Sequence, residues 1–237
     1  MDPRPAAEHP GPPPPDHPLA TQLRGFGPLG VLVTILVLAI ASLSTVLGGL
    51  LVLAWAHRSR TPWSAIGFVR PANWARTIAM GIMFGAAFKL LVKALVMPLL
   101  GAPAINEAYH HLAGNRIAAL GMLPAVIFGA GFGEETLWRG FMFERLGRLL
   151  VTRTWASVLI VLLTSVLFGV AHYQTQGIPG VQQATITGLT FGTIYAITRR
   201  LPMLMVAHAA FDVTAVAIIY WDLETTVAHW IFTAHRS

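Results

Sequence analysis

The stretch Gly131–Phe141 reads GFGEETLWRGF and places two adjacent carboxylates, Glu134 and Glu135, directly after a run of apolar and small residues. That run begins at Met122 and is apolar enough to enter a lipid bilayer. Ionisable side chains inside a membrane are costly, and they commonly face a cavity or a charged partner. The stretch therefore predicts a polar site within a membrane-embedded helix.

The composition of the whole chain points to the same environment. Of its 237 residues, 55% are hydrophobic and only 11% are charged, whereas a soluble domain carries roughly 25% charged residues. The chain has no cysteine, which excludes disulfides, cysteine nucleophiles and thiolate metal sites. Its net charge of +6 comes from arginines grouped between apolar segments, a pattern that indicates membrane topology. We expect lipids, and no nucleic acid, as partners.

Apolar segments long enough to cross a bilayer recur along the chain, since about 20 residues suffice for one helix. We expect an all-α, polytopic membrane helical bundle of six to eight transmembrane helices with an intramembrane cavity. The first segment is long enough to tilt or to bend at Gly48-Gly49, and the third could break near Gly129 or continue to Leu150. The six candidate segments are 28–56, 76–100, 117–138, 155–172, 183–198 and 202–221.

Four regions follow from these segments. Residues 1–25 are proline-rich and are expected to form a disordered tail. Residues 26–115 hold the first membrane helices, residues 116–222 hold most of the polar positions discussed below, and residues 223–237 form a C-terminal tail. Arginine over lysine and much Gly, Ala and Pro hint at a GC-rich bacterial genome, so we expect an integral protein of the bacterial plasma membrane.

Charged and small residues refine this picture. Arginines follow the first, third and fifth segments, so these loops are expected on the cytoplasmic side; the loop after the third segment is assigned Arg145, Arg148 and Arg153. Pairs of glycines four apart would let helices approach closely. The pairs are Gly81 with Gly85, Gly129 with Gly133, and Gly188 with Gly192.

The two glutamates are expected to differ in their surroundings. Glu135 and Arg139 are four apart, the spacing of an intrahelical ion pair. Glu134 points about 100° away on the helix, so it lacks that countercharge and could serve as a general base. Alternatively, both acids simply lie at a helix end near arginines.

Further ionisable residues lie in other apolar segments. His172 follows Phe168 by one helical turn, and His208 precedes Asp212 by one turn. A carboxylate one turn from a histidine can orient the ring or share a metal, although a satisfied buried pair would look the same. Lys89 and Lys93 lie on one face, as snorkelling side chains or as part of a cavity wall.

Three motifs in order resemble those of one family, the CPBP intramembrane proteases. This family includes type II CAAX prenyl endopeptidases and bacteriocin-processing and immunity proteins, and its motifs are E-E-x-x-x-R, F-x-x-x-H and H-x-x-x-N or D. Here they read EETLWR (134–139), FGVAH (168–172) and HAAFD (208–212). The resemblance covers about residues 120–220, which identifies residues 116–222 as a catalytic core.

The resemblance implies roles for these residues. Glu134 and His172 would hold and activate the attacking water, and His208 and Asp212 would stabilise the oxyanion. Glu135, Arg139 and Phe168 would support them. Position 212 departs from the asparagine of the prenyl-protein proteases, and an ionised aspartate cannot donate a hydrogen bond. It would have to be protonated, or it would orient His208 instead.

A metal is one of two alternatives for the chemistry. Members of the family are called metalloproteases, and Glu134, His172, His208 and Asp212 would make a plausible shell for a catalytic zinc ion. The sequence lacks the H-E-x-x-H motif of helical zinc proteases. A metal-free glutamate mechanism is equally compatible with the residues.

The function expected from these features is an intramembrane endopeptidase that hydrolyses a peptide bond in a membrane-associated protein or peptide. The alternative is a non-catalytic membrane scaffold or a bacteriocin-immunity-type protein of the same fold. A proton-relaying transporter would also use buried Glu and His residues, but the full set of three motifs disfavours it. The sequence specifies neither the substrate nor the oligomeric state.

Overall fold

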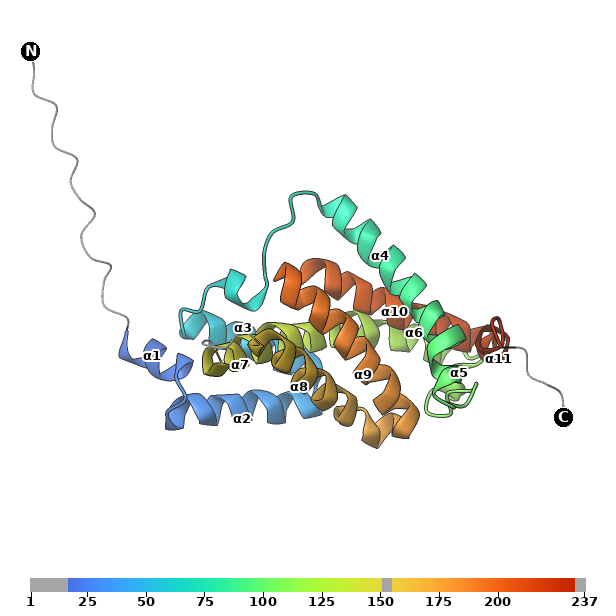
Figure 1. The fold of residues 1–237 in the computed structure, drawn as a ribbon, viewed down its shortest axis with the longest axis horizontal. Coiled ribbons are helices and arrows are strands. Elements are labelled where there is room, and N and C mark those ends of the chain that lie inside the picture. Colours follow the sequence, from blue (N-terminus) through green and yellow to red (C-terminus); the bar gives the residue numbers. More distant parts are fainter. Residues whose placement is uncertain (1–16, 151–154, 233–237) are drawn as a thin grey trace, which may run out of the picture.

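A computed structural model of the chain describes residues 17–150 and 155–232, and within these residues it is all-helical, with no strand. Figure 1 shows an elongated bundle, with α2, α3 and α7 at one end and α5 and α11 at the other. The helices are α1 (Pro18–Arg24), α2 (Pro28–Leu43), α3 (Thr45–Arg58), α4 (Trp74–Leu91), α5 (Met97–Leu99), α6 (Arg116–Pro124), α7 (Met142–Leu150), α8 (Ala156–Ala171), α9 (Tyr173–Thr198), α10 (Pro202–Tyr220) and α11 (Glu224–Ala228). Two π-helical segments, η2 (Val92–Val96) and η4 (Ala125–Phe141), and two 3-10 turns, η1 (Trp63–Ile66) and η3 (His110–Leu112), complete the set.

Three continuous helical stretches of the described chain are long and apolar enough to cross a membrane: Trp74–Leu99, Arg116–Leu150 and Pro202–Tyr220. A fourth is obtained if the bent pair α1 and α2 counts as one span. This number is lower than the six to eight expected from the sequence. Helix α8 has only 16 residues, and α9 carries glutamines and threonines along its length.

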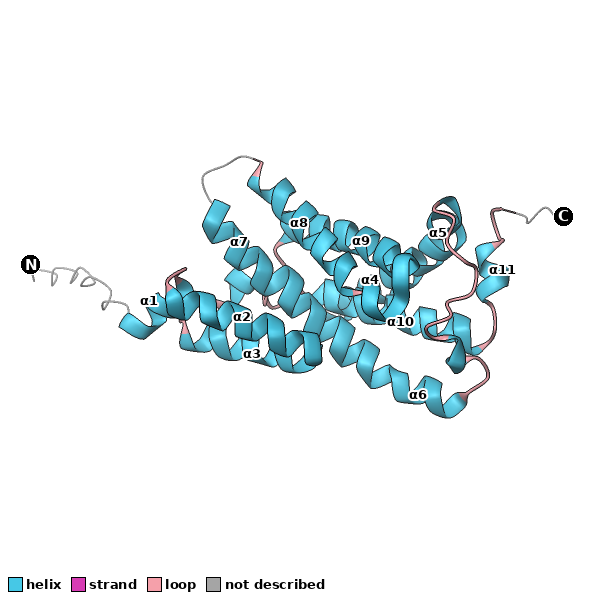
Figure 2. Ribbon diagram, turned by 90° about the horizontal axis from the view of Figure 1, so that it is seen from below, coloured by secondary structure: helices cyan, strands magenta, loops and turns pink. Residues whose placement is uncertain are grey.

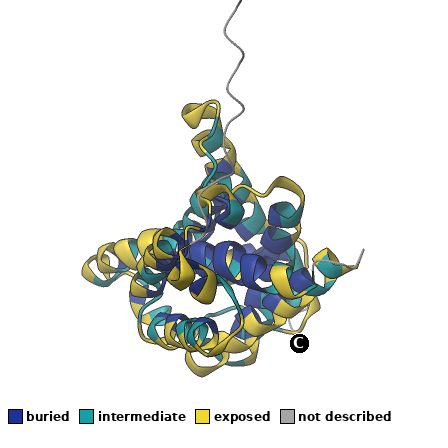
Figure 3. Ribbon diagram, turned by 90° about the vertical axis from the view of Figure 1, so that its left-hand side faces the viewer, coloured by how far each residue is buried: buried dark blue, intermediate teal, exposed yellow. Residues whose placement is uncertain are grey.

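The outer surface of the bundle is apolar, as a lipid-facing surface requires. Leu43, Met83, Ile117 and Ile197 lie on four different helices and are 84%, 72%, 86% and 79% exposed. Figure 3 shows the exposed residues around the outside and the buried ones along the middle of the bundle. Together with the three spanning helices, this surface makes the protein an integral membrane protein.

The first expected span, 28–56, is not a single helix but an antiparallel hairpin. Its chain turns at Ser44, which adopts an extended conformation and caps α3 by accepting a hydrogen bond from Leu47 N. Ala41 then packs against Gly48 across the hairpin, and Figure 2 shows α2 and α3 side by side. The sequence allowed a tilt or a bend at Gly48-Gly49. Gly48 instead provides the close packing of the two arms, and Gly49 lies against Phe132 and Gly133 of η4.

The third expected span does continue past Arg139, through α6, η4 and α7 to Leu150. It does not break at its glycines; residues 125–141 wind as a π-helix immediately after Pro124. Arg145 is therefore not a loop charge. It is 2% exposed and donates hydrogen bonds to the carbonyl oxygens of Arg24 and Gly25 at 2.6 and 2.9 Å. Arg148 also lies in α7, and Arg153 lies outside the described residues.

The expected close approach of helices at glycine pairs is confirmed. A Cβ on Gly85 of α4 would overlap the carbonyl of Ala207 of α10, and one on Gly133 of η4 would overlap the backbone of Thr45 at the start of α3. These contacts hold α4 against α10 and η4 against α3, and so they set the distance between the helices that carry the polar residues.

Both expected tails contain folded parts. Residues 1–16 and 233–237 lie outside the described residues. Within the first tail, Pro18–Arg24 forms helix α1, and its Leu23 carbonyl accepts a hydrogen bond from the Trp55 indole at 3.0 Å. Within the second, Glu224 of α11 is 1% exposed. The part of residues 1–25 that was expected to be disordered is thus helical from Pro18 to Arg24, and a buried ion pair with Lys93 holds Glu224 in the C-terminal tail.

Candidate active site

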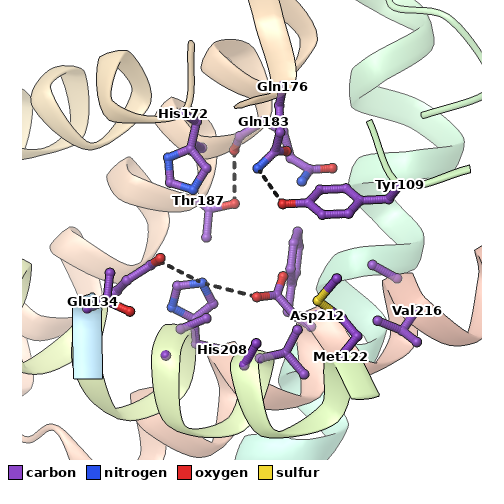
Figure 4. A pocket seen from close by; sticks show the side chains of 18 of the residues that line it. Tyr109, Met122, Glu134, His172, Gln176, Gln183, Thr187, His208, Asp212 and Val216 are labelled. Carbon is purple, nitrogen blue, oxygen red and sulfur yellow. Dashed lines mark hydrogen bonds and ion pairs between the residues drawn. The ribbon is translucent and has the colours of Figure 1, made fainter. Parts of the chain in front are cut away.

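A cavity of about 290 Å³ lies in the middle of the bundle and receives all three motifs. Glu134 reaches it from η4, His172 from the end of α8, and His208 and Asp212 from α10. The expected meeting of these four residues therefore occurs in the structure (Figure 4). The other polar side chains in its wall are Thr45, Tyr109, Gln176, Gln183 and Thr187.

Small residues before Glu134 explain how η4 comes so near to α10. A Cβ on Gly131 would lie 2.9 Å from the carbonyl oxygen of Met205 in α10. Gly133 allows the same closeness to α3 on the other side. Helix η4 is thus wedged between two helices, and Glu134, the next residue, enters the cavity with its side chain 17% exposed.

His208 is fixed by a hydrogen bond from Nδ1 to Glu135 Oε1 at 2.7 Å. An ionised carboxylate only accepts, so Nδ1 carries the proton and Nε2 faces the cavity. Nε2 lies 3.8 Å from Glu134 Oε2 and 3.8 Å from Asp212 Oδ2. These separations exceed a direct hydrogen bond and suit a bound molecule between the three groups.

Glu135 itself is fully buried and is held by Arg139, whose Nη1 donates to Oε1 at 2.8 Å. The ion pair expected from the four-residue spacing is confirmed. The Arg139 guanidinium also lies 4.8 Å from the centre of the Phe168 ring. Glu135 and Arg139 thus form a buried, charge-balanced support behind His208.

His172 is fixed by a different partner. Its Nδ1 lies 2.8 Å from the Phe168 carbonyl oxygen, which can only accept, so Nδ1 carries the proton and Nε2 is left as an acceptor. The Phe168 ring packs edge-on against both histidines, with centroids 4.7 Å from His172 and 6.1 Å from His208. Phe168 therefore sets the orientation of the two imidazoles.

The four side chains that the sequence suggested as zinc ligands have some of the features of a metal site. Both histidines hold their Nδ1 protons on outer acceptors, as metal-binding histidines do. In the part of the chain that the structure describes, however, no three His, Cys, Asp or Glu side chains gather closely enough to hold a metal ion. We therefore derive no step through a metal.

Several residues of the cavity were not recognised as site residues from the sequence. Gln176, Gln183 and Thr187 are uncharged, so a search for ionisable groups in apolar segments passes over them. Lys89 was singled out as a snorkelling or cavity-wall residue, but it does not line the cavity. It is 5% exposed and lies behind the wall, where it donates to Oε1 of the lining residue Gln183 at 2.8 Å. The glutamines and threonines between residues 176 and 187, which interrupt an apolar stretch, were the sequence feature that could have indicated a polar cavity wall.

Comparison with known proteins agrees with the geometry. The family model described as Type II CAAX prenyl endopeptidase Rce1-like matches residues 116–214, a segment that runs from the start of α6 into α10 and holds all three motifs. Neither the curated proteins nor the solved structures gave a match. Over residues 116–214, this integral membrane protein is thus similar to the type II CAAX prenyl endopeptidases.

Proposed function

We propose that this protein is an intramembrane endopeptidase that hydrolyses a peptide bond in a membrane-associated protein or peptide. The family implies a protease of the CAAX type. The observation that carries the proposal is the convergence of Glu134, His172 and His208 on one cavity within the membrane-spanning helices. An intramembrane hydrolase needs such a cavity, because water must reach a bond otherwise surrounded by lipid.

Glu134 and His172 activate the water. A water between them donates one hydrogen to the Glu134 carboxylate and the other to His172 Nε2, so a lone pair of its oxygen points away from both. As the oxygen bonds to the carbonyl carbon, Glu134 takes the proton. Glu134 then delivers this proton to the leaving nitrogen as the C–N bond breaks, and the carboxylate is restored.

His208 stabilises the oxyanion. When Nε2 is protonated it donates to the developing negative charge, and the neighbouring carboxylates of Glu134 and Asp212 at 3.8 Å compensate the imidazolium. Asp212 acts here by balancing the charge of His208 rather than by donating. This role suits an ionised aspartate at the position where prenyl-protein proteases have asparagine.

Composition and the apolar surface support a proposal for the location and the partners. We place the protein in the bacterial plasma membrane as a multi-pass protein, with lipids around its helices and a membrane-associated substrate in its cavity. A non-catalytic scaffold of the same fold is the alternative that an experiment must separate from a protease.

The test replaces Glu134 with glutamine, which keeps size and hydrogen-bonding capacity but removes the base. Membranes from cells with wild-type protein, with Glu134→Gln and with Glu107→Gln, an exposed loop position, are compared by proteomics. We expect at least one membrane protein to accumulate uncleaved only with Glu134→Gln. If the Glu134→Gln membranes match the wild type while the protein folds normally, the scaffold is the right interpretation.

A further inference from the structure

The cavity has two chemically different walls. One carries the carboxylates of Glu134 and Asp212, which in their ionised form only accept hydrogen bonds. Across from them Figure 4 shows Gln183, Gln176 and Tyr109, which can donate. The catalytic residues alone therefore offer few donors to a bound peptide, and the opposite wall could supply them.

Lys89 fixes which end of the Gln183 amide faces the cavity. The ammonium of Lys89 donates to Gln183 Oε1 at 2.8 Å, and an ammonium has no acceptor, so only the amide oxygen can occupy this position. The two N–H donors on Gln183 Nε2 must therefore point elsewhere. They form no hydrogen bond with any described residue, although Gln183 lines the cavity.

The Lys89 side chain is itself held in place. Its Nζ lies 4.8 Å from the centre of the Phe211 ring in α10, and the side chain is buried between α4, α9 and α10. A buried lysine is costly in an apolar bundle. Here its ammonium holds the Gln183 amide in one orientation, which contacts with apolar side chains would not do.

A second donor stands beside the first. Gln176 Nε2 donates to the Tyr109 hydroxyl oxygen at 3.4 Å, which leaves the hydroxyl proton of Tyr109 free to point into the cavity. The Thr187 hydroxyl, by contrast, already donates its proton to the Gln183 backbone carbonyl oxygen at 2.9 Å. Gln183 is thus the better anchored of the free donors.

A peptide cut inside a membrane needs such donors. Hydrolysis requires an extended backbone, and each carbonyl released from a helix in lipid is costly when it has no hydrogen-bond partner. We propose that Gln183, oriented by Lys89, is a substrate-binding residue that donates to a backbone carbonyl of the peptide next to the scissile bond. The inference rests on the proposed function.

The charges around the cavity favour an uncharged acceptor over a C-terminal carboxylate. While His208 is neutral, the three carboxylates of Glu134, Glu135 and Asp212 outnumber the two fixed cations Lys89 and Arg139. A further anion would be repelled by this excess. A neutral carbonyl pays no such cost, and it accepts from the amide equally well.

The test measures binding separately from cleavage. The probe is a pool of apolar octapeptides, acetylated at the N-terminus and amidated at the C-terminus, applied to purified Glu134→Gln protein; retained peptides are identified by mass spectrometry. The best-retained peptide is then titrated against Glu134→Gln alone, with Gln183→Glu, and with Gln182→Glu. Gln182 is the matched control, because its amide contacts the Leu100 carbonyl and lies outside the cavity wall.

We expect Gln183→Glu to weaken binding about three- to tenfold, the range of one net hydrogen bond, and Gln182→Glu to change it less than twofold. Replacing one amide of the peptide by an ester, which weakens its carbonyl as an acceptor, should reduce binding with Gln183 but not with the Gln183→Glu protein. The inference is overturned if the proteins with Gln183 and with Gln183→Glu bind the peptide equally, or if the protein with Gln183 retains no peptide from the pool. It is also overturned if the peptide with a free C-terminal carboxylate binds more tightly than the amidated one and this gain requires Gln183.

Failure of the proposed function looks different in the same experiment. In that case the Glu134→Gln protein retains a peptide through Gln183, but the wild-type protein leaves the same peptide uncleaved.

Discussion

His208 Nδ1 lies 2.7 Å from Glu135 Oε1, although 73 residues separate the two in the chain. The nearer candidate in sequence, Asp212, lies 3.8 Å from the other ring nitrogen. The second glutamate of the EETLWR motif thus orients the histidine of the third motif, while the first glutamate is left for the cavity. Adjacent carboxylates acquire different partners because they point to different sides of η4.

The Glu135–Arg139 pair should be essential to folding stability. In Glu135→Leu the Arg139 guanidinium loses its carboxylate while fully buried, so the free energy of unfolding should fall by about 3–5 kcal/mol. The double variant Glu135→Leu/Arg139→Met removes both charges and should recover much of this loss. Thermal unfolding in detergent measures both; a double variant less stable than the single one contradicts the account.

Asp212→Asn should retain activity within about tenfold of the wild type, because an asparagine amide can itself donate to an oxyanion. Asp212→Ala removes both the carboxylate and any donor, and it should lower kcat by about 10²-fold. Initial rates on one cleaved peptide, with unfolding curves as a check on the fold, distinguish the two. Rates equal to the wild type for both variants would leave Asp212 without a part in the chemistry.

Tyr109 should make stability decline at high pH. Burial, with the negative charges of Asp212 and Glu134 adding to it, raises the pKa of the Tyr109 phenol above its ordinary value of about 10. The folded protein then keeps the proton that the unfolded chain loses, so this stabilisation is present below pH of about 10 and is lost as pH rises towards the folded pKa. The difference in melting temperature between wild type and Tyr109→Phe should therefore shrink between pH 8 and 11; a constant difference refutes the point.

Glu224 should hold the segment that carries Tyr109. Its carboxylate accepts from Asn106 N at 2.9 Å and pairs with Lys93 and His110 at 3.4 and 3.3 Å, and Lys93 also contacts the Ala104 carbonyl. Glu224→Gln should accelerate hydrogen exchange in residues 104–112 and lower the melting temperature. Asp222→Asn, an exposed neighbour outside these contacts, is the control and should change neither.

A pair of glycine substitutions tests the helix packing. Gly85→Ala places a methyl group against the Ala207 carbonyl, and such overpacking costs about 1–3 kcal/mol. In Gly121→Ala the new Cβ meets nothing within 4 Å, so the gain in helix propensity should stabilise by about 0.5–1 kcal/mol. Unfolding in detergent of both variants checks the sign; a stabilised Gly85→Ala would place α4 and α10 farther apart.

The amino-acid sequence determined the fold class, because apolar composition and helix-length segments follow from the bilayer alone, and every membrane-embedded backbone must satisfy its own hydrogen bonds. It also specified the Glu135–Arg139 pair and the close contacts at the glycine pairs, since these depend on spacings of four residues along one helix. The order of the three motifs indicated which ionisable groups would share a cavity.

Only the tertiary structure decided what depends on contacts between distant segments. The hairpin at Ser44, the burial of Arg145 against α1 and α2, and the pairing of Lys93 with Glu224 arise from groups 100 or more residues apart or from a turn with no glycine or proline. The choice of Glu135 over Asp212 as the partner of His208 Nδ1 was settled in the same way. Local periodicity fixes which side of a helix a residue occupies, but its neighbour on that side depends on how the helices pack.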